Sequence, residues 1–323
     1  MESELYLGID TSNYTTSAAL VDADGTVIAN LKRPLAVESG ERGLRQSDAV
    51  FLHVRNLPEL MLEVKERCRG YRIAAIGVSE KPRNAEGSYM PCFLSGVVAA
   101  ESAGAACGAP VYRFSHQCGH LMAALYSAGK CGWSSRPFAA FHLSGGTTEL
   151  LVSEPGERGF RTTCIGGTRD LNAGQVIDRI GVVLGLAFPC GPALEKLAAE
   201  NRKPLPGRRR VPSEGGYVNL SGLENLSCRL YRSCGDPRLT AAFVLDYLGE
   251  AVLRMAESLQ GEYASLPLLF AGGVMSNRLL QARLRARYPD AAFAEPAFSS
   301  DNAAGIALLS RRAYLCTRHA GVV

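Results

Sequence analysis

Two of the chain's five histidines, His116 and His120, lie four residues apart at the head of an apolar run that ends near Gly129. On a helix this spacing places both imidazoles on one face, one turn apart, where they can offer two nitrogens to one metal ion. The same spacing is also typical of two half-buried or capping histidines. A metal site therefore requires further ligands from elsewhere in the chain.

Three turns rich in glycine or hydroxyl groups could bind phosphate or a nucleotide. The first, 11–17, reads TSNYTTS between two strand-like runs, and the second, 144–148, reads SGGTT between two others. The third, 272–277, reads GGVMSN and leads from a strand into a helix, whose first amides can face an anionic or purine ligand. Each turn alone is a weak signal, and the first is equally typical of a plain surface hairpin.

One carboxylate, Asp301, falls at the first turn of the last predicted helix. A carboxylate is favoured at that position and can be directed into a cleft. Together the turns, the histidine pair and Asp301 predict a nucleotide cleft with one metal ion, bound by His116, His120 and Asp301, that keeps positions open for water or phosphate. Zinc and iron both accept these ligands, and magnesium accepts them less readily.

The elements around these residues indicate a duplicated α/β fold. Residues 5–22 form a strand, a hydroxyl-rich turn and a strand, and residues 138–153 repeat this arrangement around the second turn. Two such copies predict a two-lobed fold with a ligand between the lobes. We expect the first lobe to contain 1–112 and 300–323, and the second 113–299 with a basic helical insertion around 200–240.

Length and composition agree with two globular lobes, because 323 residues exceed one compact core. A hydrophobic fraction of 47% with 20% charged residues is typical of neither a disordered nor a membrane protein. The acidic start MESE leads into a strand-like run, unlike a signal peptide. Ten scattered cysteines without a CxxC pair predict reduced thiols and a cytoplasmic location. The net charge of +4 permits a nucleic-acid partner without requiring one.

Six motifs resemble those of the TsaD/Gcp (Kae/Qri) family. They are LGIDTSNYTTSAAL at 7–20, HQCGHL at 116–121, LSGGTTEL at 143–150, AGQVIDRIGVVLGLAFPCGP at 173–192, GGVMSNRLL at 272–280 and SSDNAAGIA at 299–307. The motifs occur in the family's order over nearly the whole chain, and His53, with the nearby Arg55-Asn56-Leu57-Pro58, is similar to a further signature. The resemblance implies the two-lobed actin-like fold, shared with sugar kinases and heat-shock ATPases.

The resemblance also implies an activity, the transfer of a threonylcarbamoyl group from threonylcarbamoyl-adenylate to N6 of the adenosine beside the anticodon of certain tRNAs. It implies metal binding by His116, His120 and Asp301. The nucleotide ligands that it implies are His142, Ser144, Gly145, Gly146, Asp178, Gly191 and Asn277, with Glu195 on the ribose side. From the hydroxyl-rich first turn, Thr11 and Ser12 are further expected ligands. Because a mixed carbamic–phosphoric anhydride is already activated, no protein nucleophile is needed. The implied partners are tRNA, a smaller actin-like subunit and an ATPase subunit; no membrane is implied.

Three departures from the family pattern concern the acceptor. Cys118 replaces the glutamate of the usual HxEGH motif, and could add a sulfur ligand or only remove a charge. The segment 79–92, SEKPRNAEGSYMPC, replaces a GPGL-type loop, and 40–51, GERGLRQSDAVF, replaces a YGG signature. Because these loops line the acceptor side in the family, a paralogous carbamoyl-type transferase or ATPase with another acceptor is an alternative.

Two further functions were weighed on the same residues. A metallopeptidase is disfavoured, because Gln117 holds the position of the general-base glutamate of an HExxH motif. A non-catalytic member, which binds nucleotide only to support a partner, would keep its function after loss of His116.

Overall fold

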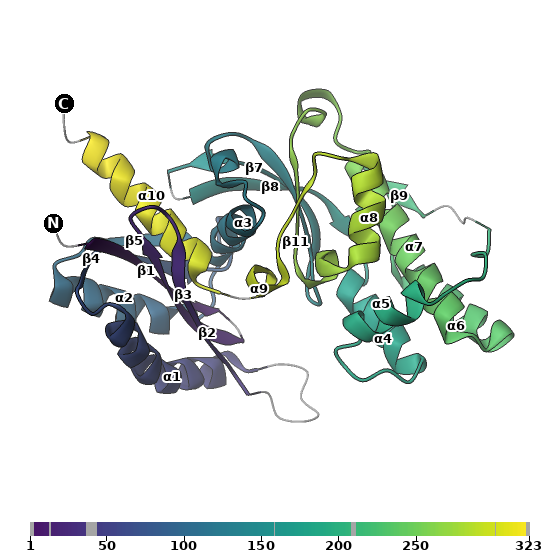
Figure 1. Cartoon of the computed structure of the whole chain (residues 1–323), viewed down its shortest axis with the longest axis horizontal. Coiled ribbons are helices and arrows are strands. Elements are labelled where there is room, and N and C mark those ends of the chain that lie inside the picture. Colours follow the sequence, from purple (N-terminus) through teal and green to yellow (C-terminus); the bar gives the residue numbers. More distant parts are fainter. Residues whose placement is uncertain are drawn as a thin grey trace. The chain divides into compact units, whose positions relative to one another are not determined.

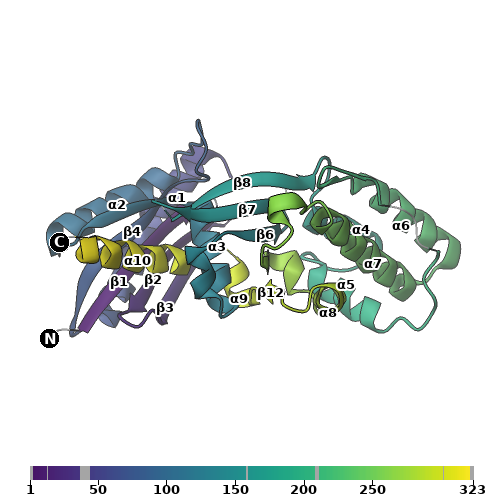
Figure 2. The ribbon, with the colours of Figure 1, turned by 90° about the horizontal axis from the view of Figure 1, so that it is seen from above.

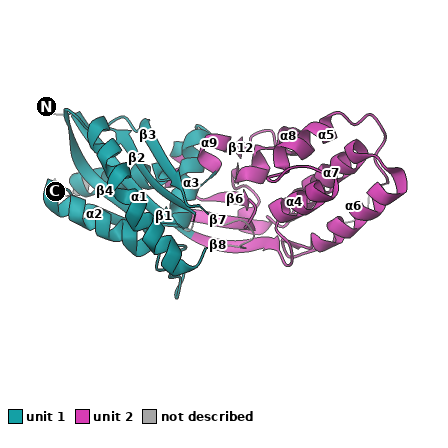
Figure 3. Ribbon diagram, turned by 90° about the horizontal axis from the view of Figure 1, so that it is seen from below, with its two compact units in different colours: residues 1–131, 155–161, 300–323 teal, residues 132–154, 162–299 magenta. Residues whose placement is uncertain are grey.

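A computed structural model describes residues 3–12, 14–36, 44–157, 159–207, 211–300 and 302–320 (Figure 1). The chain splits into two compact units, coloured separately in Figure 3: residues 1–131, 155–161 and 300–323, and residues 132–154 and 162–299. Asp301 and the arginine run 208–210, within the expected basic insertion, lie outside the described residues.

The first unit extends beyond residue 112, where the sequence placed the end of the first segment of its lobe. The physical reason is pairing and packing: β5 (Val111–Ser115) pairs with β4 (Tyr71–Lys81), and α3 (His116–Ser127) packs against α10 (Ala304–Ala320). The histidine pair on α3 therefore belongs to the first unit.

The first unit is built on a five-stranded sheet in the order β3–β2–β1–β4–β5. Its remaining strands are β1 (Ser3–Ser12), β2 (Thr15–Asp22) and β3 (Val27–Pro34). β1 pairs antiparallel with β2 and parallel with β4, so it is a central strand that is buried on both faces. This explains why its sequence is a nearly continuous apolar run.

Helices cover both faces of this sheet, with α1 (Gln46–Arg67) and α2 (Phe93–Cys107) on one face and α10 on the other (Figures 1 and 2). Side chains alternate along a strand, so Leu7 and Ile9 enter the core under α1 and α2. Gly8 faces α10, where an added Cβ would lie 2.5 Å from the carbonyl oxygen of Ala303. By the same alternation Asp10 is on the α10 face and Thr11 is on the α2 face.

The second unit contains a seven-stranded sheet in the order β12–β11–β6–β7–β8–β10–β9. The strands are β6 (Phe138–Leu143), β7 (Thr148–Gly156), β8 (Gly159–Thr168), β9 (Ser213–Glu214), β10 (Tyr217–Val218), β11 (Leu268–Ala271) and β12 (Ala292–Phe293). The helices are α4 (Ala173–Val183), α5 (Gly191–Ala199), α6 (Ser221–Cys234), α7 (Pro237–Ala256), α8 (Arg278–Arg287) and α9 (Pro296–Ser299). The tip of the β7–β8 hairpin, residues 155–161, is grouped with the first unit.

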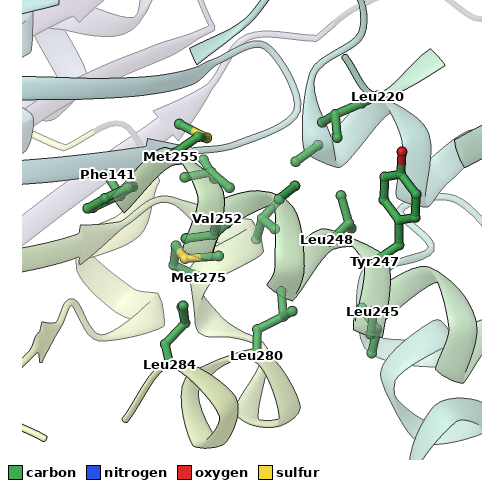
Figure 4. Packing of buried hydrophobic residues seen from close by; sticks show 14 of the residues in the cluster. Phe141, Leu220, Leu245, Tyr247, Leu248, Val252, Met255, Met275, Leu280 and Leu284 are labelled. Atoms are coloured by element: carbon green, nitrogen blue, oxygen red, sulfur yellow. The ribbon is translucent and has the colours of Figure 1, made fainter. Parts of the chain in front are cut away.

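The core of the second unit gathers around α7, which is buried along most of its length. Asp236 caps this helix by accepting hydrogen bonds from the amides of Arg238 and Leu239, and Pro237 is its first residue. Figure 4 shows Val252 and Met255 of α7 in this core together with Met275 and the α8 residue Leu280.

The two sheets have the same topology, because β8–β7–β6–β11–β12 repeats the order β3–β2–β1–β4–β5. β6 pairs antiparallel with β7 and parallel with β11, as β1 does with β2 and β4. This confirms the duplicated α/β fold predicted from the sequence. In the described parts of the chain, no helix is both long enough and apolar enough to span a membrane. All ten cysteines are free thiols.

Candidate functional site

The histidine pair opens α3, as its spacing predicted. Ser115 caps the helix, accepting a hydrogen bond from the amide of Cys118 through its side-chain oxygen at 3.3 Å. The Nε2 atoms of His116 and His120 converge to 2.8 Å, and their ring centroids are 4.3 Å apart. The two imidazoles therefore present their outer nitrogens to the same small volume.

Asp10, at the end of β1, holds the first of these histidines. Its Oδ2 lies 2.8 Å from Nδ1 of His116, and it also accepts a hydrogen bond from the hydroxyl of Ser79 on β4. Its Oδ1 accepts the amide of Ser12 at 2.9 Å. Burial alone would raise the pKa of Asp10, but the charge of His116 and the hydrogen bonds from His116, Ser79 and Ser12 hold the pKa below its ordinary value.

The sequence analysis did not identify Asp10 as a site residue. The available signal was a carboxylate at the end of a buried strand, directly before a hydroxyl-rich turn. A carboxylate that accepts the Nδ1 proton of a histidine fixes its tautomer and leaves Nε2 as a lone-pair donor. This is the arrangement in which metal-bound histidines are commonly held.

The donor set fits a transition-metal ion. Two nitrogens bound to one ion at about 2.1 Å, with angles of about 90–110°, lie roughly 3.0–3.4 Å apart. The Nε2–Nε2 separation of 2.8 Å is close to that spacing. Among the residues that the structure describes, which exclude Asp301, no group of three or more His, Cys, Asp or Glu side chains could hold an ion. The expected third ligand therefore stays a prediction.

Cys118 points into the protein rather than toward the imidazoles. Its thiol is 1% exposed and donates to the carbonyl oxygen of Phe160 at 3.4 Å. The sulfur accepts hydrogen bonds from the amide of Phe160 and from Nδ2 of Asn84. Burial raises the pKa of this thiol, which disfavours the thiolate needed for metal binding. These contacts favour a packing role over that of a sulfur ligand.

The β1–β2 turn in the first unit directs its hydroxyls to different partners. The hydroxyl of Thr11 is buried, donates to the carbonyl of Cys92 at 3.0 Å and accepts the amide of Gly96 at 3.0 Å. This side chain anchors the turn to the start of α2. The side chain of Ser12 is 3% exposed, and its oxygen has no hydrogen-bond partner. Ser12 is therefore better placed than Thr11 to interact with a ligand through its hydroxyl.

A cavity of about 430 Å³ lies within the second unit. Five of the residues expected to bind the nucleotide line it: Gly145, Asp178, Gly191, Glu195 and Asn277. The sequence analysis missed the apolar walls, which are formed by Ile177, Pro189, Pro192, Val274 and Pro296. A volume of 300–1,000 Å³ with apolar walls and a few polar groups is typical of a small-molecule site.

Glycines leave open space around this cavity. A Cβ added to Gly145, Gly191 or Gly273 would meet no protein atom within 4 Å. None of the three has a positive φ, so the backbone does not require glycine there. Protein packing therefore does not explain these glycines, whereas the close approach of a ligand to the backbone does. The cavity thus fits a nucleotide, whose base or phosphates can lie directly against the chain.

The polar groups of the cavity are held at helix ends. Asp178 on α4 accepts the amide of Cys190 at 2.8 Å, just before α5 begins. Glu195 on α5 accepts the amide of Arg278 at 2.7 Å, and Asn277 caps α8 by accepting the amide of Leu280 at 3.0 Å. Both carboxylates are thereby fixed by backbone amides rather than by cationic side chains.

The remaining expected nucleotide ligands, His142, Ser144 and Gly146, lie on the β6–β7 hairpin but do not line this cavity. His142 is on β6 opposite Glu149, and the amide of Ser144 donates to the carbonyl of Thr147 at 2.8 Å to close the turn. The turn contacts the start of α4, where a Cβ on Gly174 would lie 2.7 Å from Cα of Gly145. Gly174 also lines the cavity.

Comparison with known folds supports the architecture. The crystal structure of T. kodakarensis HypF matches 98% of this chain and 48% of its own, with a TM-score of 0.60 and 14% identity. Component A of (R)-2-hydroxyglutaryl-CoA dehydratase from Acidaminococcus fermentans matches 96% of this chain and 99% of its own, with a TM-score of 0.55 and 15% identity. The chain has the actin-like ATPase and sugar-kinase fold.

Comparison of sequences identifies the family. A family described as TsaD, tRNA N6-adenosine threonylcarbamoyltransferase, matches residues 39–308. A curated tRNA N6-adenosine threonylcarbamoyltransferase from Thermus thermophilus is 31% identical over 97% of this chain and 93% of its own length. The match spans both units and includes the histidine pair and the second-unit cavity. The chain belongs to the TsaD family of tRNA N6-adenosine threonylcarbamoyltransferases.

Proposed function

We propose that this protein transfers a threonylcarbamoyl group from threonylcarbamoyl-adenylate to N6 of an adenosine in tRNA. The observation that carries the proposal is the family match over residues 39–308. The adenosine N6 amine would attack the carbamoyl carbon, the bond from that carbon to the phosphate oxygen would break, and AMP would leave with the electron pair. The nitrogen loses one proton, and no covalent intermediate with the protein is needed.

The second-unit cavity is the proposed site for the adenylate. The open glycines Gly145, Gly191 and Gly273 allow the nucleotide to lie against the backbone. Asp178 and Glu195, each held by a backbone amide, are suited to accept hydrogen bonds from base or ribose hydroxyl donors. Orientation of an already activated anhydride supplies much of the catalysis such a reaction requires.

The histidine pair is the proposed metal site, with zinc or iron preferred over magnesium because both imidazoles offer nitrogen. His116 and His120 would bind through Nε2, and Asp301 remains the expected third ligand. A bound ion would act as a Lewis acid toward a carbonyl or phosphoryl oxygen. Asp10 would keep the His116 proton on Nδ1, so that Nε2 stays available.

The proposed partners are tRNA, a smaller actin-like subunit and an ATPase subunit, and the proposed compartment is the cytoplasm. Ten free thiols support a reducing compartment. Apolar side chains exposed on the first unit support a protein contact: Phe51, Val54 and Leu62 on α1, and Leu94 and Val98 on α2. The two helices contact each other, and apolar surface exposed on a folded protein commonly marks an interface.

A second candidate, transfer to another acceptor, is favoured by the segment 79–92. It packs beside the histidine helix, because the amide of Gln117 donates to the carbonyl of Pro82 at 3.0 Å and Nδ2 of Asn84 donates to the sulfur of Cys118 at 3.3 Å. A loop of altered sequence next to the proposed metal site could select an acceptor other than tRNA.

The test is mass spectrometry of nucleosides from unmodified tRNA incubated with the full chain, its partner proteins and threonylcarbamoyl-adenylate. We expect threonylcarbamoyl-adenosine with the wild type and none above background with His116→Ala. If a folded wild type consumes the donor but leaves tRNA unmodified, the tRNA assignment is wrong and the second candidate stands. If His116→Ala retains full activity, the proposed metal role is wrong.

A further inference from the structure

His53, on α1, is a buried histidine to which the proposed reaction assigns no role. Its side chain is 0% exposed, and its two ring nitrogens have different surroundings. Nδ1 lies 2.8 Å from the hydroxyl of Thr16 on β2, whereas Nε2 has no hydrogen-bond partner in the described part of the chain. A buried polar atom without a partner is rare in folded proteins and requires an explanation.

The partners of Thr16 determine which nitrogen of His53 carries the proton. Thr16 is fully buried, and its hydroxyl oxygen accepts a hydrogen bond from Nδ2 of Asn56 at 3.3 Å. If Nδ1 of His53 also donated to Thr16, the Thr16 oxygen would accept two hydrogen bonds, and its own buried proton would have no acceptor. The hydroxyl therefore donates to Nδ1, and the proton of the neutral ring is on Nε2.

The neutral form is the one that the surroundings favour. Burial lowers the pKa of His53, against the opposing effects of Asp10 and of the Ser12 backbone. The Ser12 backbone is near enough to the ring to favour its protonated form, and burial outweighs that effect.

Thr16 connects this ring to the turn between β1 and β2. In the strand register Thr16 is opposite Thr11, and Ser12 is opposite Thr15. Thr11 is tied to α2 through Cys92 and Gly96. His53 and Asn56 tie Thr16 to α1. The two strands are thus held by different helices just where the turn begins.

Among the described residues, two buried polar atoms of this region have no hydrogen-bond partner, Oγ of Ser12 and Nε2 of His53. The amide of Ser12 is in turn held by Asp10, the carboxylate that contacts His116. We infer that His53 is a positioning residue of the β1–β2 turn: as the Nε2–H tautomer it holds Thr16 through Nδ1 and directs its buried N–H toward the turn that carries Ser12. His53 thus supports the turn that, through Asp10, also contacts the histidine pair.

Three variants separate the parts of this inference. His53→Phe keeps a flat ring and removes both nitrogens. Thr16→Val removes only the hydroxyl, and His53→Asn retains an amide oxygen near the place of Nδ1. Ser310→Ala is the matched control, because Ser310 on α10 is a buried hydroxyl of the same unit that also lacks a hydrogen-bond partner.

Hydrogen exchange of peptides covering residues 10–17 tests the positioning role without any ligand. We expect about tenfold faster exchange in His53→Phe and Thr16→Val, as for the loss of one buried hydrogen bond, and a smaller change in His53→Asn. The double variant should accelerate exchange by less than the product of the two single effects, because both changes remove the His53–Thr16 bond and only Thr16→Val also removes the bond from Asn56. Wild-type exchange rates in both single variants would overturn the inference, as would an equal acceleration in Ser310→Ala.

The tautomer has its own spectroscopic signature. In protein labelled at histidine nitrogens, the resonances of His53, assigned by their loss in His53→Phe, should show a protonated Nε2 and an unprotonated Nδ1 at neutral pH. A proton on Nδ1 would overturn the hydrogen-bond assignment with Thr16. His53→Asn also lacks the ring and supplies the same assignment where His53→Phe does not fold.

Discussion

The β1–β2 turn and the β6–β7 turn occupy equivalent places in the two repeated sheets, yet they are built differently. The β1–β2 turn is fixed by side chains, with Asp10, Thr11 and Thr16 each engaged in buried hydrogen bonds. The β6–β7 turn closes through its backbone, and Gly145 and Gly146 have open space where a Cβ would lie. A duplicated scaffold can therefore supply one turn that is rigidly linked to a histidine site and another that leaves room for a ligand.

The largest expected effect comes from removing the histidine site that the β1–β2 turn contacts through Asp10. We expect His116→Ala to lower the rate of threonylcarbamoyl transfer about 10³-fold, as for the loss of several kcal/mol of charge stabilisation. Metal retained by the purified protein, measured by mass spectrometry, should also fall. AMP affinity should change little, because the cavity lies in the other unit. Loss of AMP affinity in folded protein would contradict this separation.

The link between turn and histidine is tested by Asp10→Asn. The amide has the size of the carboxylate but can donate an N–H to Nδ1 of His116. The proton of the neutral His116 ring is then favoured on Nε2, which is no longer available to a metal ion. We expect metal affinity and activity to fall about 10- to 100-fold, as for other residues that hydrogen-bond to a metal-binding histidine. Metal content titrated with a chelator provides the measurement. Wild-type metal affinity would show that Asp10 has no influence on the histidine pair.

The glycine turn is tested by comparing two substitutions that should act in different ways. Gly145→Ala would place a methyl group in the cavity without touching the protein, so we expect about tenfold weaker AMP binding and an unchanged melting temperature. Gly174→Ala would bring Cβ within 2.7 Å of the backbone at Gly145, so we expect a loss of about 1–3 kcal/mol of stability. Calorimetry and thermal unfolding separate the two. Equal losses of stability in the two variants would contradict the open space at Gly145.

As the pH falls, the first unit should lose stability at a higher pH than the second unit. Because the pKa of His53 is lowered in the fold from its ordinary 6.5, its contribution to stability is complete above pH 6.5 and is lost as the pH falls below that value. The expected slope is at most about 1.4 kcal/mol per pH unit. Asp170 in the second unit has its pKa lowered to about 2; burial opposes this, and hydrogen bonds from Ser221, Leu220 and Leu171 cause it. Its contribution is present above pH 3.8 and is lost only as the pH falls toward 2.

Two probes follow the units separately in this pH experiment. Trp133, the chain's single tryptophan, reports on the second unit, and hydrogen exchange of α1 peptides, corrected for the intrinsic pH dependence, reports on the first. Between pH 7.5 and 5 we expect urea resistance to fall in α1 but not at Trp133. His53→Phe should remove most of the pH dependence in α1; an unchanged slope would exclude His53 as its source.

The smallest effect is expected for Cys118→Ser. The thiol contacts Phe160 and Asn84 rather than the imidazoles, so metal content and transfer rate should stay within about twofold of the wild type. A hydroxyl can replace its hydrogen bonds with shorter ones, and we expect a stability change of about 1 kcal/mol, measured by thermal unfolding. Loss of bound metal in folded Cys118→Ser protein would show that the sulfur is a ligand after all.

Much of the fold could be predicted because its signals are local. The apolar runs at 5–10 and 138–143, each followed by a turn and a second run, were sufficient to indicate the duplication that the sheets confirm. The spacing of His116 and His120 was sufficient to place both imidazoles on one helix face. The end of the first segment of the first unit could not be predicted from local signals, because it depends on the pairing of β5 with β4.

The histidine pair was thus determined by the sequence alone, since helical periodicity brings residues four apart together. The support of the pair by Asp10 was not determined by the sequence alone, because Asp10 is distant in the chain. Only the alternation of side chains along β1, together with the packing of α3, directs the Asp10 carboxylate to His116. Likewise, the hydroxyl-rich composition of 11–17 was visible in the sequence. Tertiary contacts decided that Thr11 and Thr16 anchor the turn and that the Ser12 hydroxyl has no hydrogen-bond partner among the described residues. Spacing specifies which groups can meet along one element, whereas packing between elements decides which of them are already engaged.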